Sequence, residues 1–223
     1  MAAFMAVFVL LAVFAIGAFA NDPDMLQDVC VADCTSVLLI NVLGILVNGY
    51  TCKNISTITP EDFFFAGISQ PGQITNNILG SKGTKANVKD IPGLNTLGLS
   101  MSRVDFAPYG LNPPHVHPRA SEMIFVLEGE LYVGFITTNN KLISKVVKVG
   151  EVFVFPKGLA HFLKNMLKYP AAILAAFNSQ LPGTQQLAAA LFTSDPSVPN
   201  DVLAQAFNIE EKDIEKIRVG LTP

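Results

Sequence analysis

The chain has 223 residues, of which 50% are hydrophobic and 15% are charged, and its formal net charge is −3. This length suffices for one sizeable domain with its own core, and the apolar fraction argues against a globally disordered chain. The sequence contains no basic stripe interleaved with aromatic residues, which argues against nucleic-acid binding.

Residues 1–20 form an uncharged apolar segment that ends in Ala18-Phe19-Ala20. Small residues at Ala18 and Ala20 match a signal-peptidase site, which predicts a secreted protein whose mature chain begins at Asn21. No Lys or Arg precedes the apolar segment, which is unusual for a signal peptide. Because about twenty apolar residues can span a bilayer, a membrane anchor is the alternative. The polar residues that follow favour cleavage, which leaves no membrane segment.

Residues 21–96 are expected to form an N-terminal extension that carries the cysteines Cys30, Cys34 and Cys52. Cysteines grouped in one segment of a secreted chain predict a local disulfide, and three cysteines leave one unpaired. Asn54 begins the sequon Asn-Ile-Ser and is a candidate glycosylation site.

Two segments of this extension differ in composition. The apolar run Ser36–Val47 is too short to span a membrane and is interpreted as a buried strand or hairpin arm. Residues 66–96 are rich in Gly, Asn, Ser, Thr and Pro and are expected to form an extended loop with little regular structure.

Residues 97–180 contain short apolar runs separated by turn residues. Many short strands at regular spacing predict an all-β sandwich or barrel. Met101 and Met123 are expected in the core of this domain, and Asp105 is expected to pair with Arg103 on one strand face. The expected strands are Leu97–Phe106, Glu122–Leu127, Leu131–Thr137, Leu142–Val149, Val152–Phe155, Phe162–Asn165 and Ala171–Phe177.

Residues 181–223 are expected to be helical, over Leu187–Phe192, Val202–Phe207 and Ile209–Arg218. The last of these helices carries an apolar stripe, and such a stripe is more often core than interface.

All three histidines fall in two short segments, one with His115 and His117 and the other with His161. Alternate side chains of a strand share a face, so His115 and His117 can aim at one point. Glu122 follows a Pro-containing stretch that can turn the chain back. Three imidazole nitrogens and one carboxylate oxygen form a ligand set for a divalent first-row transition metal, with room for water or substrate. Ordinary core or surface histidines are the alternative, but no histidine lies outside the pattern.

The chain at these motifs resembles the germins and germin-like proteins, secreted plant members of the cupin superfamily. The resemblance covers essentially the whole mature chain and is most specific in the two histidine-bearing segments, Gly110–Arg119 and Gly150–His161. Further matching segments are Asp22–Asp33, Pro92–Gly98, Leu127–Gly134 and Phe177–Gly183.

The resemblance implies a cupin jelly-roll β-barrel with C-terminal helices. It implies manganese held by His115, His117, Glu122 and His161. It also implies a homohexamer, a trimer of dimers in which the C-terminal helices clasp neighbouring subunits. The disulfide that it implies joins Cys30 to Cys52. Because this segment is longer than usual and Cys34 is additional, a Cys34–Cys52 bond is the alternative.

The activity expected from the resemblance is manganese-dependent superoxide dismutation in the apoplast, with a role in defence or the cell wall. Asn112 is the candidate for positioning the small anionic substrate. Oxalate-oxidising germins have a second Asn where this chain has Ser102. Because shortening an amide donor to a hydroxyl removes discrimination for an anion, oxalate oxidase activity is in doubt. A non-catalytic extracellular binding or receptor-like protein with a structural metal is a further alternative.

Overall fold

The computed structural model describes residues 28–34, 49–74 and 78–221. The predicted signal peptide at residues 1–20 and the apolar run Ser36–Val47 therefore lie outside the described residues. Among the helices in the described ranges, none is long and apolar enough to cross a membrane.

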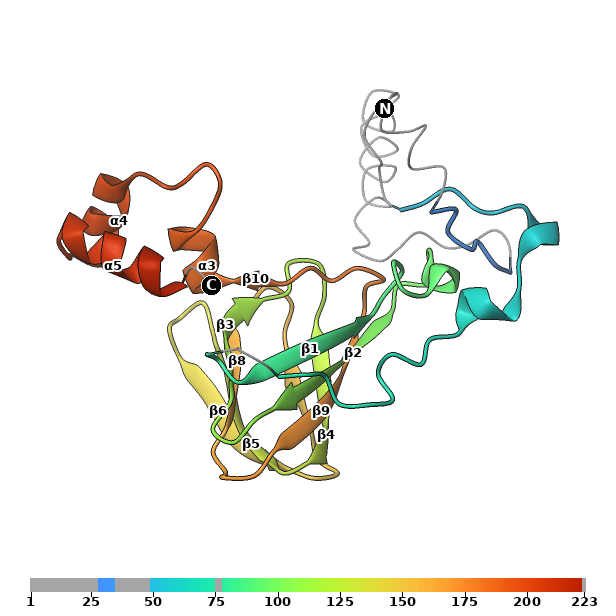
Figure 1. Ribbon diagram of the computed structural model, residues 1–223, viewed down its shortest axis with the longest axis horizontal. Coiled ribbons are helices and arrows are strands. Elements are labelled where there is room, and N and C mark those ends of the chain that lie inside the picture. The colour runs from blue at the N-terminus through green and yellow to red at the C-terminus, as the bar shows by residue number, and fades with distance from the viewer. Residues whose placement is uncertain (1–27, 35–48, 75–77, 222–223) are drawn as a thin grey trace, which may run out of the picture.

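Two five-stranded antiparallel sheets face each other and form a barrel (Figure 1). The first sheet contains, in spatial order, β1 (Ser81–Ala86), β2 (Ser100–Phe106), β9 (Ala171–Phe177), β4 (Glu122–Glu128) and β7 (Val152–Phe155). The second contains β10 (Gln185–Gln186), β3 (Leu111–Val116), β8 (His161–Asn165), β5 (Glu130–Ile136) and β6 (Leu142–Lys148). The all-β jelly-roll barrel expected from the sequence is confirmed.

The barrel core forms where the inward faces of the two sheets meet. Alternation along β4 buries Ile124 and Val126, and β5 buries Leu131 and Val133 from the opposite sheet. Glu122 shares the inward face with Ile124 and is itself buried. The strand period therefore places a carboxylate inside the barrel, at the start of β4.

Strand β1 lies in a segment that was expected to have little regular structure, and that expectation is wrong. Residues 81–86 pair with β2 along their whole length, and Lys85 stands opposite Ser102. The sequence Ser-Lys-Gly-Thr-Lys-Ala contains no large apolar residue, so it gives no hydrophobic alternation. Strand β1 is an edge strand whose inner face lines a cavity instead of packing into the core, so it needs no large apolar side chains.

The outer face of the first sheet differs from the expectation for its methionines. Met101 is 39% exposed and Met123 is 50% exposed, so their assignment to the core is wrong. Alternation identifies the buried face of a strand only when the other face is polar. Both faces of β4 carry apolar residues, so the sequence does not show which face is buried. The expected pairing of Arg103 with Asp105 is present, with the Arg103 Nε donating to Asp105 Oδ1 over 2.9 Å.

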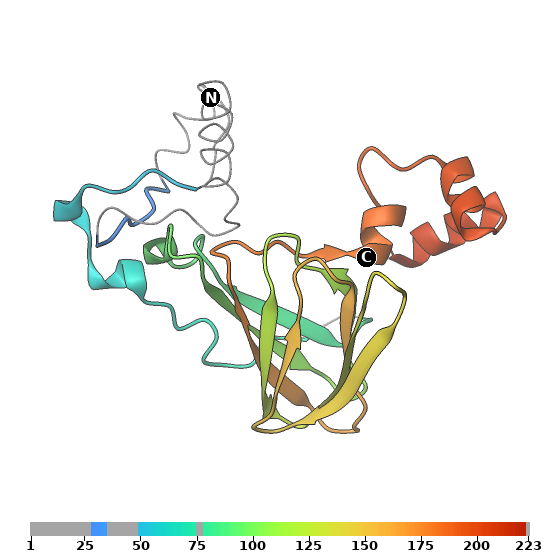
Figure 2. The same ribbon diagram turned by 180° about the vertical axis from the view of Figure 1, so that it is seen from behind.

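Three helices follow the barrel: α3 (Leu187–Phe192), α4 (Asn200–Phe207) and α5 (Glu211–Leu221). Phe192, Leu203 and Ile214 contribute one buried residue from each helix to a separate small core. Figure 2 shows these helices and the N-terminal region on opposite sides of the barrel. The predicted helical segment is thus present, and α5 begins two residues later than expected.

The N-terminal extension is cross-linked internally by a disulfide and by a buried amide. The disulfide joins Cys30 to Cys52, whose Cα atoms are 4.8 Å apart, and leaves Cys34 as an exposed free thiol. The fully buried Asn95 donates through Nδ2 to the Tyr50 carbonyl oxygen over 2.9 Å. Short 3-10 helices, η1 (Ile55–Thr57), η2 (Pro60–Phe63) and η3 (Pro92–Leu94), complete this region.

Candidate metal site

The structure brings all four predicted ligand residues together at one end of the barrel. His115 on β3 and His161 at the start of β8 are cross-strand partners whose ring centroids lie 4.1 Å apart. His117 follows β3, and Glu122 begins β4 in the opposite sheet. The four ligand atoms lie within 4.8 Å of one another, and all four residues are buried. The cluster therefore joins the two sheets.

Each histidine ring is oriented by a backbone carbonyl that accepts a hydrogen bond from Nδ1. His115 contacts the Pro113 oxygen over 2.8 Å, and His161 contacts the Leu159 oxygen over 2.8 Å. His117 contacts the Gly183 oxygen over 2.5 Å. Because a carbonyl only accepts, Nδ1 carries the proton in each ring and the Nε2 lone pair is left for a cation.

The contacts of Glu122 show that a cation fits between these side chains. Its Oε2 lies 3.1 Å from Nε2 of His117 and 3.0 Å from Nε2 of His161. A neutral imidazole has one N–H, and both rings already use theirs at Nδ1. The Nε2 lone pairs of both rings therefore point at the Glu122 carboxylate. This arrangement is repulsive unless a positive charge lies between them. Three nitrogens and one oxygen match the ligands of first-row transition metals.

Burial keeps this ligand set in its metal-binding protonation state. Burial, aided by the nearby His161, lowers the pKa of His115 from 6.5 to about 4, so its imidazole is neutral near pH 7. Burial raises the pKa of Glu122, but hydrogen bonds and positive charge placed at the Nε2 atoms of His117 and His161 outweigh it and lower that pKa to about 2. A metal ion held by the same atoms would favour the carboxylate in the same way. The site therefore presents a carboxylate and neutral imidazole without a prior loss of protons.

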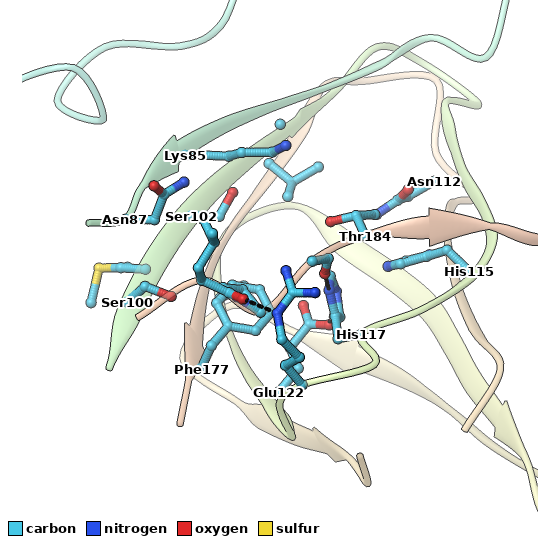
Figure 3. Close-up of a pocket in the computed structure, with 18 of the residues that line it drawn as sticks. Lys85, Asn87, Ser100, Ser102, Asn112, His115, His117, Glu122, Phe177 and Thr184 are labelled. Atoms are coloured by element: carbon cyan, nitrogen blue, oxygen red, sulfur yellow. Dashed lines mark hydrogen bonds and ion pairs between the residues drawn. The ribbon is translucent and has the colours of Figure 1, made fainter. Parts of the chain in front are cut away.

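Two phenylalanine rings pack against the cluster from the barrel core. Phe155 stacks on His161 with centroids 4.5 Å apart, and the ring of Phe177 meets His117 at 4.8 Å. On its other side the cluster borders a cavity of about 660 Å³ (Figure 3). Water and solutes therefore reach the site from one direction.

Two candidate substrate residues line this cavity, and their side chains differ in what they offer. Asn112 on β3 makes no side-chain hydrogen bond within the described part of the chain, so its amide is available to a ligand. The Ser102 hydroxyl donates to the Thr84 carbonyl oxygen over 3.0 Å. Its proton is therefore directed into the backbone, and Ser102 offers a ligand only lone pairs.

The sequence did not reveal the groups that orient the histidines, because they are backbone oxygens. Gly183 has a left-handed φ of +73°, and a Cβ there would lie 2.8 Å from Nη2 of Arg119. The Arg119 Nε in turn donates to the Leu181 carbonyl oxygen over 2.6 Å. A Pro-Gly pair in an irregular segment was the available signal for such a position.

Comparisons with known proteins agree with this fold and site. The model of the cupin family matches residues 66–215. The chain is 61% identical over 205 residues to germin-like protein subfamily 2 member 4 of Arabidopsis thaliana, covering 92% of this chain and 90% of that protein. It is 56% identical over 214 residues to germin-like protein 5-1 of Oryza sativa subsp. japonica, covering 96% and 92%.

Among solved structures, a recombinant oxalate oxidase in complex with glycolate superimposes with a TM-score of 0.84. It shares 43% sequence identity, and the match covers 91% of this chain and 98% of that one. The match to the family model and the relatives of more than half identity over nine tenths of the chain agree with the buried His-Glu site. The chain therefore belongs to the germin-like proteins, a family of the cupin superfamily.

Proposed function

We propose that the chain is a manganese-dependent superoxide dismutase that produces hydrogen peroxide in the plant apoplast. The observation that carries this proposal is the convergence of three Nε2 lone pairs and the Glu122 carboxylate on one point at the end of an open cavity. Four protein ligands leave about two positions on a six-coordinate ion for water or a small anion.

Bound manganese supplies a one-electron redox couple and the open coordination positions. The net reaction converts two superoxide anions and two protons into dioxygen and hydrogen peroxide. Within the chain, Asn112 presents an amide donor that can hold a small anion at the cluster. The carbonyl of Gly183 keeps His117 in the tautomer that coordinates. The choice of manganese rests on the family resemblance, because this ligand set also suits iron and zinc.

The extracellular location in this proposal is supported by two features of the N-terminal extension. The Cys30–Cys52 disulfide is typical of an oxidising compartment. Asn54 is exposed, and its Oδ1 accepts hydrogen bonds from the backbone and hydroxyl of Ser56, which leaves Nδ2 accessible for a glycan.

The proposed assembly is a homohexamer built as a trimer of dimers, and the outer face of the first sheet supports it. Met123 and Phe125 of β4 stand opposite Val154 and Val152 of β7, and all four are between 42% and 56% exposed. A contiguous apolar sheet face of this kind marks an interaction surface. A second copy of the chain, packed face to face, would cover it.

The dismutase proposal is tested with Glu122→Gln and a matched control, Glu128→Gln, on the same strand. Glu128 is exposed and lies outside the cluster. The secreted wild type and Glu128→Gln should contain near-stoichiometric manganese and dismute superoxide, whereas Glu122→Gln and His115→Ala should lose both. Size-exclusion chromatography checks that each variant remains assembled. Zinc in the wild type, or manganese without turnover, would refute the proposal.

Oxalate oxidase is the second candidate, favoured by the likeness to the solved oxalate oxidase and by Asn112 in the cavity. Oxalate would occupy the same open positions, and hydrogen peroxide is again a product. The Ser102 hydroxyl weakens this candidate because it donates to the Thr84 oxygen instead of facing the anion.

A non-catalytic binding protein with a structural metal is the third candidate. The size of the cavity favours it, because about 660 Å³ exceeds what a diatomic anion needs. Metal removal would then dissociate or unfold the oligomer, and the metal-loaded wild type would show no turnover. Thermal unfolding with and without a chelator, beside the dismutation assay, separates this candidate from the enzyme.

A further inference from the structure

The cavity beside the metal site is much larger than the small anions considered above require. Its volume is about 660 Å³, within the range of pockets that hold whole organic ligands. One water molecule occupies about 30 Å³ of liquid. Superoxide or oxalate at the cluster would therefore leave most of the cavity to solvent.

One side of the cavity carries positive charge. Lys85 and Asn87 lie across the cavity from His115 and His117 (Figure 3). Lys89 also lines it, and neither lysine forms an ion pair with any residue that the structure describes. Glu122, which belongs to the metal cluster, is the one carboxylate among the described lining residues. The lysine end therefore favours an anion by itself, whereas the histidine end does so once it holds a metal ion.

The amide of Asn87 completes the lysine end. Asn87 is only 7% exposed, and its Oδ1 accepts from the Lys89 backbone N–H over 2.9 Å. Its Nδ2 has no acceptor within the described ranges and lines the cavity as a donor. The nearby Asp90 accepts from the Asn87 backbone N–H but does not line the cavity. Two ammonium groups and an amide donor together suit a carboxylate.

Hydroxyl groups of serine and threonine also line the cavity. Ser100 and Ser102 donate their protons to the carbonyl oxygens of Ser179 and Thr84. Their remaining lone pairs can accept from hydroxyl groups of a ligand. Thr184 adds a further hydroxyl from the opposite wall. Val104, Ala175 and Phe177 line the cavity as well, so a ligand with both hydroxyl groups and a carbon chain suits it.

We propose that this cavity binds a linear, hydroxylated organic dianion, with one carboxylate at the metal and the other at Lys85, Lys89 and Asn87. A six-carbon sugar diacid has this chemistry. The inference rests on the proposed function in one respect, because the histidine end must hold a metal ion to attract the first carboxylate. Beyond the proposed function, the inference assigns a second anion-binding subsite to the cavity and names the class of ligand that would occupy both subsites.

The test compares two acids that differ only at one end. Galactarate carries a carboxylate at both ends of a six-carbon chain, whereas galactonate carries a carboxylate at one end and a hydroxyl at the other. Isothermal titration calorimetry on the manganese-loaded, assembled protein should show galactarate binding at least about tenfold more tightly, as expected for one added charge-assisted contact. Equal affinities would overturn the proposal.

Lys85→Met and Lys82→Met form a matched pair of variants on β1. Lys82 does not line the cavity, whereas Lys85 does. Lys85→Met should weaken galactarate about tenfold and leave galactonate unchanged, and Lys85→Met with Lys89→Met should abolish the preference. Lys82→Met should change neither affinity. An equal loss in Lys82→Met and Lys85→Met, or no loss in either, would contradict the subsite.

Acid binding and superoxide turnover are measured independently, so either proposal can be refuted without the other. Manganese content is measured for every variant, and dismutation is assayed on the same preparations. Preferential galactarate binding without dismutation supports the subsite and refutes the dismutase. Dismutation without any preference between the two acids refutes the subsite and leaves the dismutase.

Discussion

The Nδ1–H of His117 donates to the carbonyl oxygen of Gly183, 66 residues further along the chain. Gly183 lies between the last long barrel strand and the C-terminal helices, so this bond ties the metal cluster to the segment that leads to the helices. The guanidinium of Arg119 occupies the space next to the Gly183 Cα. The orientation of one ligand therefore depends on a backbone position whose left-handed φ favours glycine.

Gly183→Ala is expected to lower metal affinity about 10- to 100-fold, as the loss of groups that orient metal ligands does in other proteins. A Cβ there would lie 2.8 Å from Nη2 of Arg119, and the φ of +73° is strained for alanine. The exposed Arg119 side chain can move aside, so the backbone strain is the expected cause of a shift in the carbonyl that holds His117. Competition with a calibrated chelator measures the manganese dissociation constant.

Gly150→Ala is the control for this change. Gly150 also has a positive φ, +83°, but nothing lies within 4 Å of its Cβ position. Both variants should lose about 1 kcal/mol of stability from backbone strain. Only Gly183→Ala should lose metal affinity, and equal manganese affinities in the two variants would show that the Gly183 carbonyl does not position His117.

His115 and His117 could be predicted from their local spacing, and Glu122 and His161 because no other histidine was left over and the motifs resemble those of germins. The strands Val152–Phe155 and Ala171–Phe177 were also predicted with their observed bounds, since each is a compact apolar run between turn residues. These features depend on periodicity within a few residues, which a single sequence displays.

Other features depend on contacts that a single sequence does not display. The carbonyl of Gly183 has no side-chain signature, and its partner lies far away in the chain. Strand β1 can carry lysines because its inner face borders a cavity and not the core, and its polar composition therefore suggested a loop. Met123 was assigned to the core because the sequence does not show which apolar face of β4 meets the second sheet.

The stability of the metal-free protein should depend on pH through His115. Burial, with His161 beside it, lowers the pKa of His115 from 6.5 to about 4 in the fold. Between these values the unfolded chain binds a proton that the fold does not, so stability is full above pH 6.5 and falls as the pH approaches 4. The loss is about 3 kcal/mol at 1.36 kcal/mol per pKa unit.

Urea unfolding of chelator-treated protein at several pH values measures this dependence. His115→Gln should remove the corresponding part of the slope between pH 6.5 and pH 4. Glu122, whose pKa is lowered from 4.5 to about 2, contributes stability above pH 4.5 that is lost as the pH falls towards 2. An unchanged slope in His115→Gln would mean that His115 does not carry the effect.

Ser102→Asn is expected to raise oxalate-dependent release of hydrogen peroxide by at least about tenfold, because it restores an amide donor beside the site. The wild-type hydroxyl donates to the Thr84 oxygen and has no second proton for an anion. Ser144→Asn, on the exposed strand β6, controls for the substitution itself. If Ser102→Asn contains a full complement of manganese but releases no more hydrogen peroxide than wild type, residue 102 does not limit oxalate turnover.

The cysteines should separate into one bonded pair and one reactive thiol. Alkylation without reduction should label Cys34 alone, and peptide mapping should recover Cys30 linked to Cys52. Cys52→Ser should lower the free energy of unfolding by about 3 kcal/mol, as expected for a loop of this length, and Cys34→Ser should leave it unchanged. Recovery of a Cys34–Cys52 peptide would contradict the pairing in the structure.

Met123→Glu combined with Phe125→Glu should dissociate the proposed hexamer. Both side chains point outward from β4 and stand opposite Val154 and Val152, so two carboxylates would be buried without partners in a face-to-face dimer. Light scattering after size-exclusion chromatography measures the mass. Thr138→Glu with Asn139→Glu adds the same charge in an exposed turn and should leave the mass unchanged. Because the outer face is separate from the cavity, the dissociated subunits should retain manganese. An unaltered mass would mean that this face is not the interface.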